Sequence, residues 1–360
     1  MPESNPWGPH DSGPQGAHLV GSINLPDAES VFRTVSAHLG DRLRRMPDGE
    51  VGERYYWIQF QRDRLAATKG LNRIPGDPVY VRGQFDARPL MLDSGIDAAS
   101  LTLGSLGYAD AAIASYATFA ALREAGVIAP GTRFQVSLPT PAAVIASFIV
   151  PGNRAALEPV YAHAIFGELA RILEEIPHED LAIQWDTAVE FGLLESARLP
   201  SGYPLTPWFD DVLGGVLERA AEQASAVPED VEVGYHLCYG DVEETHFVQP
   251  QDTGHLAAFI TGVLAKNARP INWFHLPVPI ERDDDAYFAP LADVNLPDET
   301  ELYLGLVHHE DGVDGALRRQ RAARRAQSRF GVATECGFGR GLSERTAPLL
   351  DLHAAVSAAW

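Results

Sequence analysis

The sequence contains little cysteine and little positive charge. Only two of its 360 residues are cysteine, which is too few for a disulfide framework and favours a reducing cytoplasm. Lys and Arg total 28 against 49 Asp and Glu, and the resulting net charge of −21 repels a phosphate backbone. Nucleic acid is therefore a poor candidate partner, and we interpret the excess acid mainly as a solubilising surface.

Long apolar runs and nucleotide-binding loops are also missing. No apolar run reaches the roughly 18 to 20 residues that span a bilayer, and residues 1–10 lack the build of a signal peptide. We therefore expect no membrane partner, a cytoplasmic protein and a flexible tail over residues 1–16. No Gly-x-Gly-x-x-Gly follows a strand-like run and no phosphate-loop Gly-Lys-Ser/Thr occurs, which argues against the common nucleotide sites.

The chain does contain short β-branched or apolar runs that alternate with longer helical patterns, which indicates parallel βαβ units. Eight such runs predict an α/β fold, a (β/α)8 TIM barrel over residues 17–360 in one domain, with an insertion after the second strand. The alternative is a doubly wound open sheet. The expected strands are 18–23, 41–46, 132–138, 181–186, 231–238, 270–275, 301–307 and 331–336. The insertion should hold a helix near 55–67 and a hairpin-like pair at 79–85 and 88–92.

Side chains that bind metals stand at the expected strand ends, which is where chemistry takes place in such a barrel. His236 and Cys238 alternate on one strand and therefore point to the same side. A thiolate beside an imidazole suits zinc, and Cys336 ends the last strand, so these three residues are candidate ligands. His275 ends the sixth strand and is a candidate fourth ligand, with a buried core histidine as the alternative.

Other polar residues follow the same pattern. His308 and His309 come after the seventh strand and are candidates for proton transfer, with a solvated loop as the alternative. Asp186 ends the fourth strand and is a candidate for catalysis or substrate binding, or a helix cap. Gln184 shares its strand face, so we expect it in the barrel interior and include it among candidate substrate contacts.

Four segments of the chain resemble the catalytic barrel of cobalamin-independent methionine synthase, in the superfamily shared with uroporphyrinogen decarboxylase. They are Gly21-Ser22, Ile183-Gln-Trp-Asp186, Tyr235-His-Leu-Cys238, and Thr334-Glu-Cys-Gly337 with Arg340. Their order and strand positions agree over about residues 17–358. The resemblance adds Ser22 and Arg340 to the candidate substrate contacts.

The resemblance implies a zinc ion on His236, Cys238 and Cys336 that ionises a thiol acceptor. The family places a glutamate ligand at the end of strand six, where this chain has His275, which would give two His and two Cys ligands. It also implies that Asp186 holds a substrate amino group.

The resemblance further implies that His309, or its neighbour His308, transfers a proton. Where the family continues with Glu-Pro after its aspartate, this chain has Thr187-Ala188, so homocysteine is not fixed as the acceptor.

The leading hypothesis is zinc-dependent transfer of a methyl or small alkyl group to a small-molecule thiol. The donor would be a methylated folate, a methylcorrinoid, free or on a corrinoid protein, or a methoxylated small molecule. One alternative is a metal-free decarboxylase or lyase that uses Arg340, Arg45 and Asp48 to hold acidic substrate groups. Another is a non-catalytic barrel that zinc stabilises.

Overall fold

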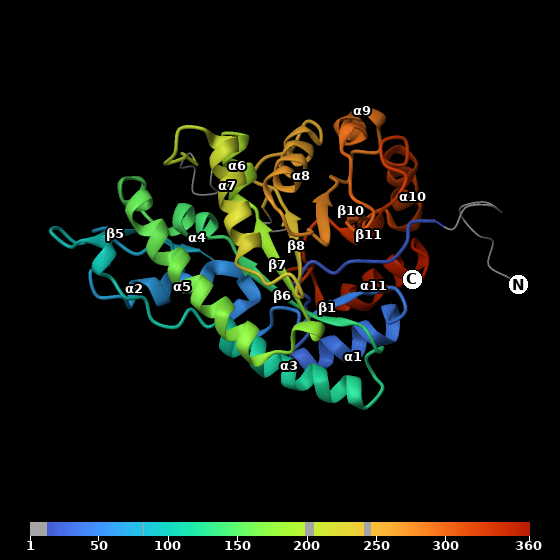
Figure 1. The fold of residues 1–360 in the computed structure, drawn as a ribbon, viewed down its shortest axis with the longest axis horizontal. Coiled ribbons are helices and arrows are strands. Elements are labelled where there is room, and N and C mark those ends of the chain that lie inside the picture. Colours follow the sequence, from blue (N-terminus) through green and yellow to red (C-terminus); the bar gives the residue numbers. More distant parts are fainter. Residues whose placement is uncertain (1–12, 82, 199–204, 241–245) are drawn as a thin grey trace, which may run out of the picture.

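The computed structural model describes residues 13–81, 83–198, 205–240 and 246–360. Its centre is a curled sheet of seven parallel strands in the order β1-β6-β7-β8-β9-β10-β11 (Figure 1). The strands are adjacent in chain order without a reversal, which excludes the doubly wound alternative. They are β1 (Arg45–Pro47), β6 (Arg133–Pro139), β7 (Leu181–Thr187), β8 (Glu232–Leu237), β9 (Trp273–Pro277), β10 (Glu301–Val307) and β11 (Gly331–Thr334).

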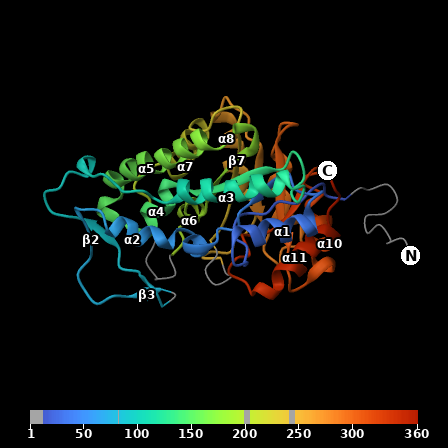
Figure 2. The same ribbon diagram turned by 90° about the horizontal axis from the view of Figure 1, so that it is seen from below.

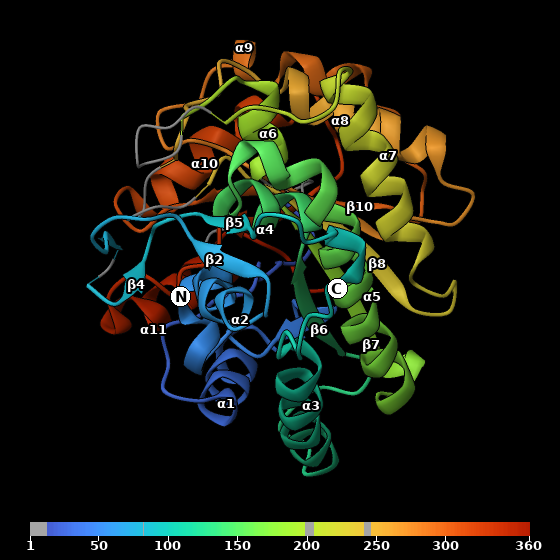
Figure 3. The ribbon, with the colours of Figure 1, turned by 90° about the vertical axis from the view of Figure 1, so that its left-hand side faces the viewer.

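Helices surround the strands on the outside, as the view in Figure 3 shows. This arrangement is consistent with a TIM-like barrel. Among the described residues, no helix combines the length and the apolar character needed to cross a bilayer. The helices are α1 (Ala28–Leu39), α2 (Gln61–Ala66), α3 (Tyr108–Glu124), α4 (Pro141–Phe148), α5 (Arg154–Glu175), α6 (Val189–Leu194), α7 (Val212–Ser225), α8 (Gly254–Lys266), α9 (Asp285–Phe288), α10 (Gly312–Ala323) and α11 (Thr346–Ala355).

Local sequence explains both kinds of element. Every residue of β7 is buried, because one face of a parallel barrel strand meets the interior and the other meets helices. Helix α1 begins after Asp27, whose side chain accepts a hydrogen bond from the backbone N–H of Ser30. It buries Val31, Val35 and Leu39, which recur at helical spacing, and packs against α3 and α11.

The expected first strand, residues 18–23, does not form a regular ladder. Parallel bridges join Ala17 to Val332 of β11 and Ser22 to Gly49, just beyond β1. The segment changes its partner from one sheet edge to the other within six residues, so no run of consecutive pairs can develop. It nevertheless lies between the two edges of the seven-stranded sheet.

The expected N-terminal tail is only partly described, since residues 1–12 lie outside the described ranges. Gln15 donates a backbone hydrogen bond to Phe330 (3.1 Å), and Gly16 donates one to Ala358 (2.9 Å). The chain is therefore tied to the barrel slightly before residue 17.

The region between β1 and α3 differs in detail from the expected helix and hairpin. A 3-10 segment, Gly52–Phe60, precedes the short α2. The turn at Gly83, where φ is +67°, divides the expected arm 79–85, so β3 (Tyr80–Val81) pairs with β4 (Phe85–Asp86). The neighbouring β5 (Leu90–Leu92) pairs instead with β2 (Leu71–Arg73). In Figure 2, β2 and β3 project at the end of the molecule opposite the C-terminus.

Candidate metal centre

Three possible metal ligands meet at the carboxyl ends of β8 and β11. His236 lies on β8, Cys238 directly follows that strand, and Cys336 follows β11. The Nε2 of His236 lies 3.5 Å from the Sγ of Cys336, and the two Sγ atoms are 3.9 Å apart. The three ligand atoms lie within 4.8 Å of one another, and no other such group of His, Cys, Asp and Glu occurs within the described ranges.

These distances suit zinc. Tetrahedral zinc with ordinary Zn–N and Zn–S bonds places a nitrogen and a sulfur about 3.5 Å apart, and two sulfurs about 3.8 Å apart. The contacts at Cys336, 3.5 Å to His236 and 3.9 Å to Cys238, are close to both values. One imidazole and two thiols also form a donor set that favours zinc, whereas harder divalent ions prefer oxygen ligands. The residues present therefore fit the metal.

The sequence of β8 explains how His236 and Cys238 reach the interior. Alternate residues of a strand share a face, and Gly234 lies two positions before His236 on that face. A Cβ at Gly234 would come within 2.0 Å of the ring of Trp273, its neighbour on β9. Gly234 thus allows the large indole to fill the barrel interior below the candidate ligands.

Two hydrogen-bond donors face the sulfur atoms. The backbone N–H of Gly240 lies 3.2 Å from the Sγ of Cys238, and an Nη of Arg340 lies 3.8 Å from the Sγ of Cys336. Arg340, which the sequence indicated as a substrate contact, is therefore placed against a candidate metal ligand.

His275 lies behind His236 and outside the group of three. Its Nδ1 is 2.7 Å from the Nδ1 of His236, and its Nε2 is 2.9 Å from the carbonyl oxygen of Thr334. Burial lowers the pKa of His275 to about 3, and burial followed by the His275 ring lowers that of His236 well below its usual range. Both nitrogens of His275 are engaged by protein atoms, so the structure does not place it as the fourth ligand that the sequence suggested.

Asp186 and Glu50 form a second polar group near the same end of the barrel. Asp186 is 5% exposed, and its carboxylate accepts hydrogen bonds from Gln184 (2.9 Å) and from the indole N–H of Trp57 (3.2 Å). Burial and then the charge of Glu50 raise the pKa of Asp186 well above its usual range. Burial raises the pKa of Glu50 to about 7, although Arg54 opposes the shift.

Glu50 was not among the residues that the sequence indicated. It follows β1 at the carboxyl end, in the same relation to its strand as the other candidates. Strand-end position was the signal that could have identified it. The expected second strand covers residues 41–46, whereas β1 covers Arg45–Pro47, which brings Glu50 closer to the observed strand end.

Gln184 and Ser22 are held by protein groups. Gln184 is fully buried, and its side-chain amide donates a hydrogen bond to the carbonyl oxygen of Val20 (2.6 Å). Its Oε1 lies 2.9 Å from the Nε2 of His18. It fills the barrel interior and orients Asp186. The hydroxyl of Ser22 accepts a hydrogen bond from the backbone N–H of Gly339 (3.3 Å), which ties down the loop after β11.

The two histidines after β10 have different surroundings. His308 is buried, donates from Nε2 to the carbonyl oxygen of Val278 (2.9 Å) and directs Nδ1 towards Glu335, 3.9 Å away. Burial lowers the pKa of His308 to about 4. The side chain of His309 is 31% exposed and lies 3.1 Å from Glu310. His308 therefore lies beside the segment that carries Cys336, because Glu335 immediately precedes that cysteine.

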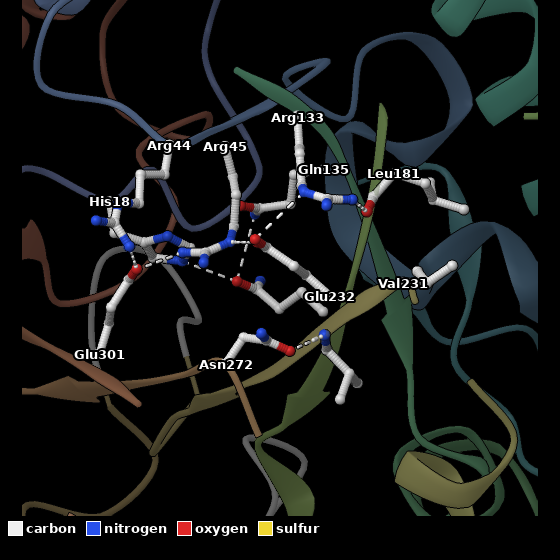
Figure 4. Close-up of polar contacts among 12 residues, drawn as sticks. His18, Arg44, Arg45, Arg133, Gln135, Leu181, Val231, Glu232, Asn272 and Glu301 are labelled. Atoms are coloured by element: carbon white, nitrogen blue, oxygen red, sulfur yellow. Dashed lines mark hydrogen bonds and ion pairs between the residues drawn. The ribbon is translucent and has the colours of Figure 1, made fainter. Parts of the chain in front are cut away.

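Arg45, which the decarboxylase alternative requires, is the first residue of β1 and therefore lies at the amino end of the sheet, opposite the candidate metal centre. Figure 4 shows its polar neighbours. Its guanidinium forms ion pairs with Glu232 and Glu301, the first residues of β8 and β10. Asp48 in turn accepts hydrogen bonds from Arg54 (2.6 Å) and from the hydroxyl of Ser115 (2.6 Å). Both charges are compensated within the protein, so this alternative retains only Arg340 from its expected set.

Comparison with solved structures shows what the fold resembles. The chain matches a candidate vitamin-B12-independent methionine synthase from Listeria monocytogenes with a TM-score of 0.57 at 15% identity, covering 96% of this chain and 98% of that one. A B12-independent methionine synthase from Shewanella sp. W3-18-1, in complex with selenomethionine, gives 0.48 at 13% identity, covering 95% and 96%. A methyltransferase from Methanosarcina mazei gives 0.46 at 11% identity, covering 97% and 93%.

At these identities the first match shows a shared fold, and we draw no argument from the other two. No protein-family model matches the sequence, and neither does any curated protein.

Proposed function

We propose that this chain is a zinc-dependent methyl or small-alkyl transferase that activates a small-molecule thiol in the cytoplasm. The observation that carries the proposal is the meeting of His236, Cys238 and Cys336 within 4.8 Å of one another, in which both contacts at Cys336 have lengths that suit tetrahedral zinc. They lie at the carboxyl ends of the strands, the usual place for barrel chemistry. We also infer a (β/α)8 barrel, in which residues 18–23 fill the eighth position and the region between β1 and α3 is an insertion.

Zinc held by these residues would supply an open coordination position at which a thiol loses its proton near neutral pH. The protein would orient the rest of the acceptor through Asp186 and Glu50. Burial raises the pKa values of both carboxyl groups although Arg340 opposes the shift, so a substrate ammonium group placed against them would stabilise both as carboxylates. Trp57 and Gln184 hold the two oxygens of Asp186 in a fixed orientation.

His308 and Glu335 would handle the proton at the donor. The buried ring of His308 keeps Nδ1 as a proton acceptor, because Nε2 already donates to the Val278 carbonyl. His309 would act only if its exposed side chain turned inward, so we assign proton transfer to His308. Methylated folate, methylcorrinoid, a corrinoid protein and methoxylated small molecules are the donor classes to assay.

The first experiment measures zinc content and turnover in the Cys238→Ala and Cys336→Ala variants. Each variant loses one thiolate, so we expect less than one equivalent of zinc and a loss of thiol alkylation, whichever donor proves active. The matched control is Ser225→Ala, a side chain exposed on α7 that donates only to a backbone carbonyl. Full zinc and full turnover in both cysteine variants, or no zinc in the unchanged protein, would contradict the proposal.

Cobalt substitution tests the non-catalytic alternative. A barrel that zinc merely stabilises requires a closed site with four protein ligands, whereas the described residues bring three together. An added thiol should therefore change the visible spectrum of the cobalt-substituted protein. A spectrum that saturating thiol leaves unchanged would favour the closed, structural site.

A further inference from the structure

A chain of hydrogen bonds runs behind the candidate metal centre, from the backbone of β11 to His236. The carbonyl oxygen of Thr334 lies 2.9 Å from the Nε2 of His275, and the Nδ1 of His275 lies 2.7 Å from the Nδ1 of His236. Both rings are buried, and His275 is fully so. The strand register places the two histidines directly opposite each other on β8 and β9. The contact therefore belongs to the sheet and not to a loop.

The direction of each hydrogen bond in this series follows from the Thr334 carbonyl, where the series begins. A carbonyl oxygen only accepts, so the proton between Thr334 and His275 belongs to the Nε2 of His275. A neutral His275 ring then has an unprotonated Nδ1, which must accept from the Nδ1–H of His236. A neutral His236 is left with an unprotonated Nε2, the atom that lies 3.5 Å from Cys336.

We propose that His275 is a positioning residue that holds His236 in the tautomer whose Nε2 can bind a metal, so that His236, and not His275, joins Cys238 and Cys336 as a ligand. This inference deepens the proposed function and rests on it for the identity of the metal. Its consequence is that, among the described residues, a thiol would compete with no fourth side chain for the metal. A ligand imidazole whose second nitrogen donates to a fixed acceptor is a common means of setting ring orientation.

The first test needs no metal. Long-range ¹H–¹⁵N spectra of metal-free protein labelled at histidine distinguish the two neutral tautomers, with signals assigned through His236→Gln and His275→Gln. We expect an Nδ1–H tautomer for His236 and an Nε2–H tautomer for His275. An Nε2–H tautomer for His236 in the unchanged protein would overturn the proposal. Because this readout is independent of zinc, it separates failure of the inference from failure of the proposed function.

The second test compares zinc affinity, by chelator competition, among His275 variants. His275→Leu removes the acceptor for His236, and we expect affinity to fall by about 10- to 100-fold, the usual effect of losing such a partner. His275→Gln has a carbonyl oxygen to accept from His236 and an N–H to donate to Thr334, so we expect it to recover most of the loss. Equal losses in the Leu and Gln variants would overturn the proposal.

The cobalt spectrum of His275→Gln provides the spectroscopic test. If His275 only positions His236, the ligand-field bands should match those of the unchanged protein, because the donor atoms are the same. A changed band pattern would identify His275 as a ligand and overturn the proposal.

The matched control is His353→Gln, at another fully buried histidine that contacts a backbone carbonyl, that of Leu349 (2.7 Å). We expect no change in its zinc affinity. If zinc affinity fell as much in His353→Gln as in His275→Leu, general disruption of the core would explain both losses, and the proposal would be overturned. Circular dichroism of every variant confirms that the affinities compare folded proteins.

Discussion

At the scale of the residue, the partners of each side chain decide what it can do. The sulfur of Cys238 faces the backbone N–H of Gly240, and the sulfur of Cys336 faces the guanidinium of Arg340. His275 has the same chemistry as His236, yet both of its nitrogens are used within the protein. Trp57 adopts a left-handed backbone conformation, with φ +52°, while its indole N–H holds Asp186. A bulky residue in that conformation is strained, which is typical of functional sites.

The carboxyl pair gives a pH-dependent prediction at this scale. The pKa of Glu50 is raised to about 7, so its carboxyl gains charge as the pH rises through about 7. We expect the preference for L-homocysteine over 4-mercaptobutanoate, which lacks only the ammonium group, to increase over that interval. Competition binding at several pH values measures the ratio of the two affinities. Ionisation of the thiol group affects both compounds and therefore has little effect on this ratio.

Glu50→Gln should flatten the pH profile of this preference, because an amide does not ionise. The same raised pKa means that the folded state holds a proton that the unfolded state releases. Glu50 therefore lowers the stability of the empty protein as the pH rises from about 4.5 to about 7. An unchanged preference across pH in the unmodified protein would contradict a role for Glu50 in binding an amine.

At the scale of the element, period-two alternation on β8 places Gly234 and His236 on one face. The ring of Trp273 occupies the space that a side chain at position 234 would need. The glycine at position 234 therefore leaves room for Trp273 beneath the ligand His236 at the carboxyl end of the strand. Neighbouring strand β9 presents His275 in register with His236, which makes their contact a property of the sheet.

Gly234→Ala tests this packing. The new Cβ would meet the fully buried Trp273 at 2.0 Å, so we expect the free energy of unfolding to fall by about 1–3 kcal/mol. Zinc affinity should also fall, because His236 lies on the same strand. Gly167→Ala is the matched control on helix α5, where a Cβ meets nothing within 4 Å, and we expect a gain of about 0.5–1 kcal/mol. Urea unfolding distinguishes the two, and equal stabilities would contradict the packing argument.

At the scale of the whole molecule, the two ends of the barrel differ in chemistry. The carboxyl end holds the sulfurs, imidazoles and carboxylates of the candidate site. The amino end holds Arg45, whose guanidinium lies 4.2 Å from the ring of Trp273 and forms ion pairs with Glu232 and Glu301 (Figure 4). Charged groups at the amino end connect strands that are distant in sequence. Residues at this end of a TIM-like barrel usually serve stability and not catalysis.

Arg45→Met tests this division. Removal of the guanidinium leaves Glu301 with Arg44 and Glu232 with Arg133 as their remaining cations, so we expect a loss of about 1–3 kcal/mol in the free energy of unfolding. Zinc content should remain at one equivalent, because the change lies at the other end of the barrel. Thermal unfolding and metal analysis of the same sample measure both effects. A variant that keeps its stability but loses zinc would contradict this division of roles.

Much of the fold was predictable because parallel strands have short apolar sequences and their helices have an apolar face. Strands β6, β7, β8, β10 and β11 lie close to the expected positions. The segment 18–23 was harder to predict because its hydrogen bonds go to two different partners, and no local pattern encodes that change. Glu50 was missed because the strand before it is only three residues long.

Local sequence patterns are enough to predict which residue types stand at the strand ends, since strand periodicity and turn residues are local properties. They place two thiols and several imidazoles at the carboxyl ends of the strands. Which of these side chains meet depends on long-range packing: Cys238 and Cys336 are 98 positions apart, yet their sulfurs are 3.9 Å apart. The tertiary structure also decided that His275 supports His236, because the relevant carbonyl, that of Thr334, belongs to a strand 59 residues away. Such partners depend on strand order and register, which long-range packing sets.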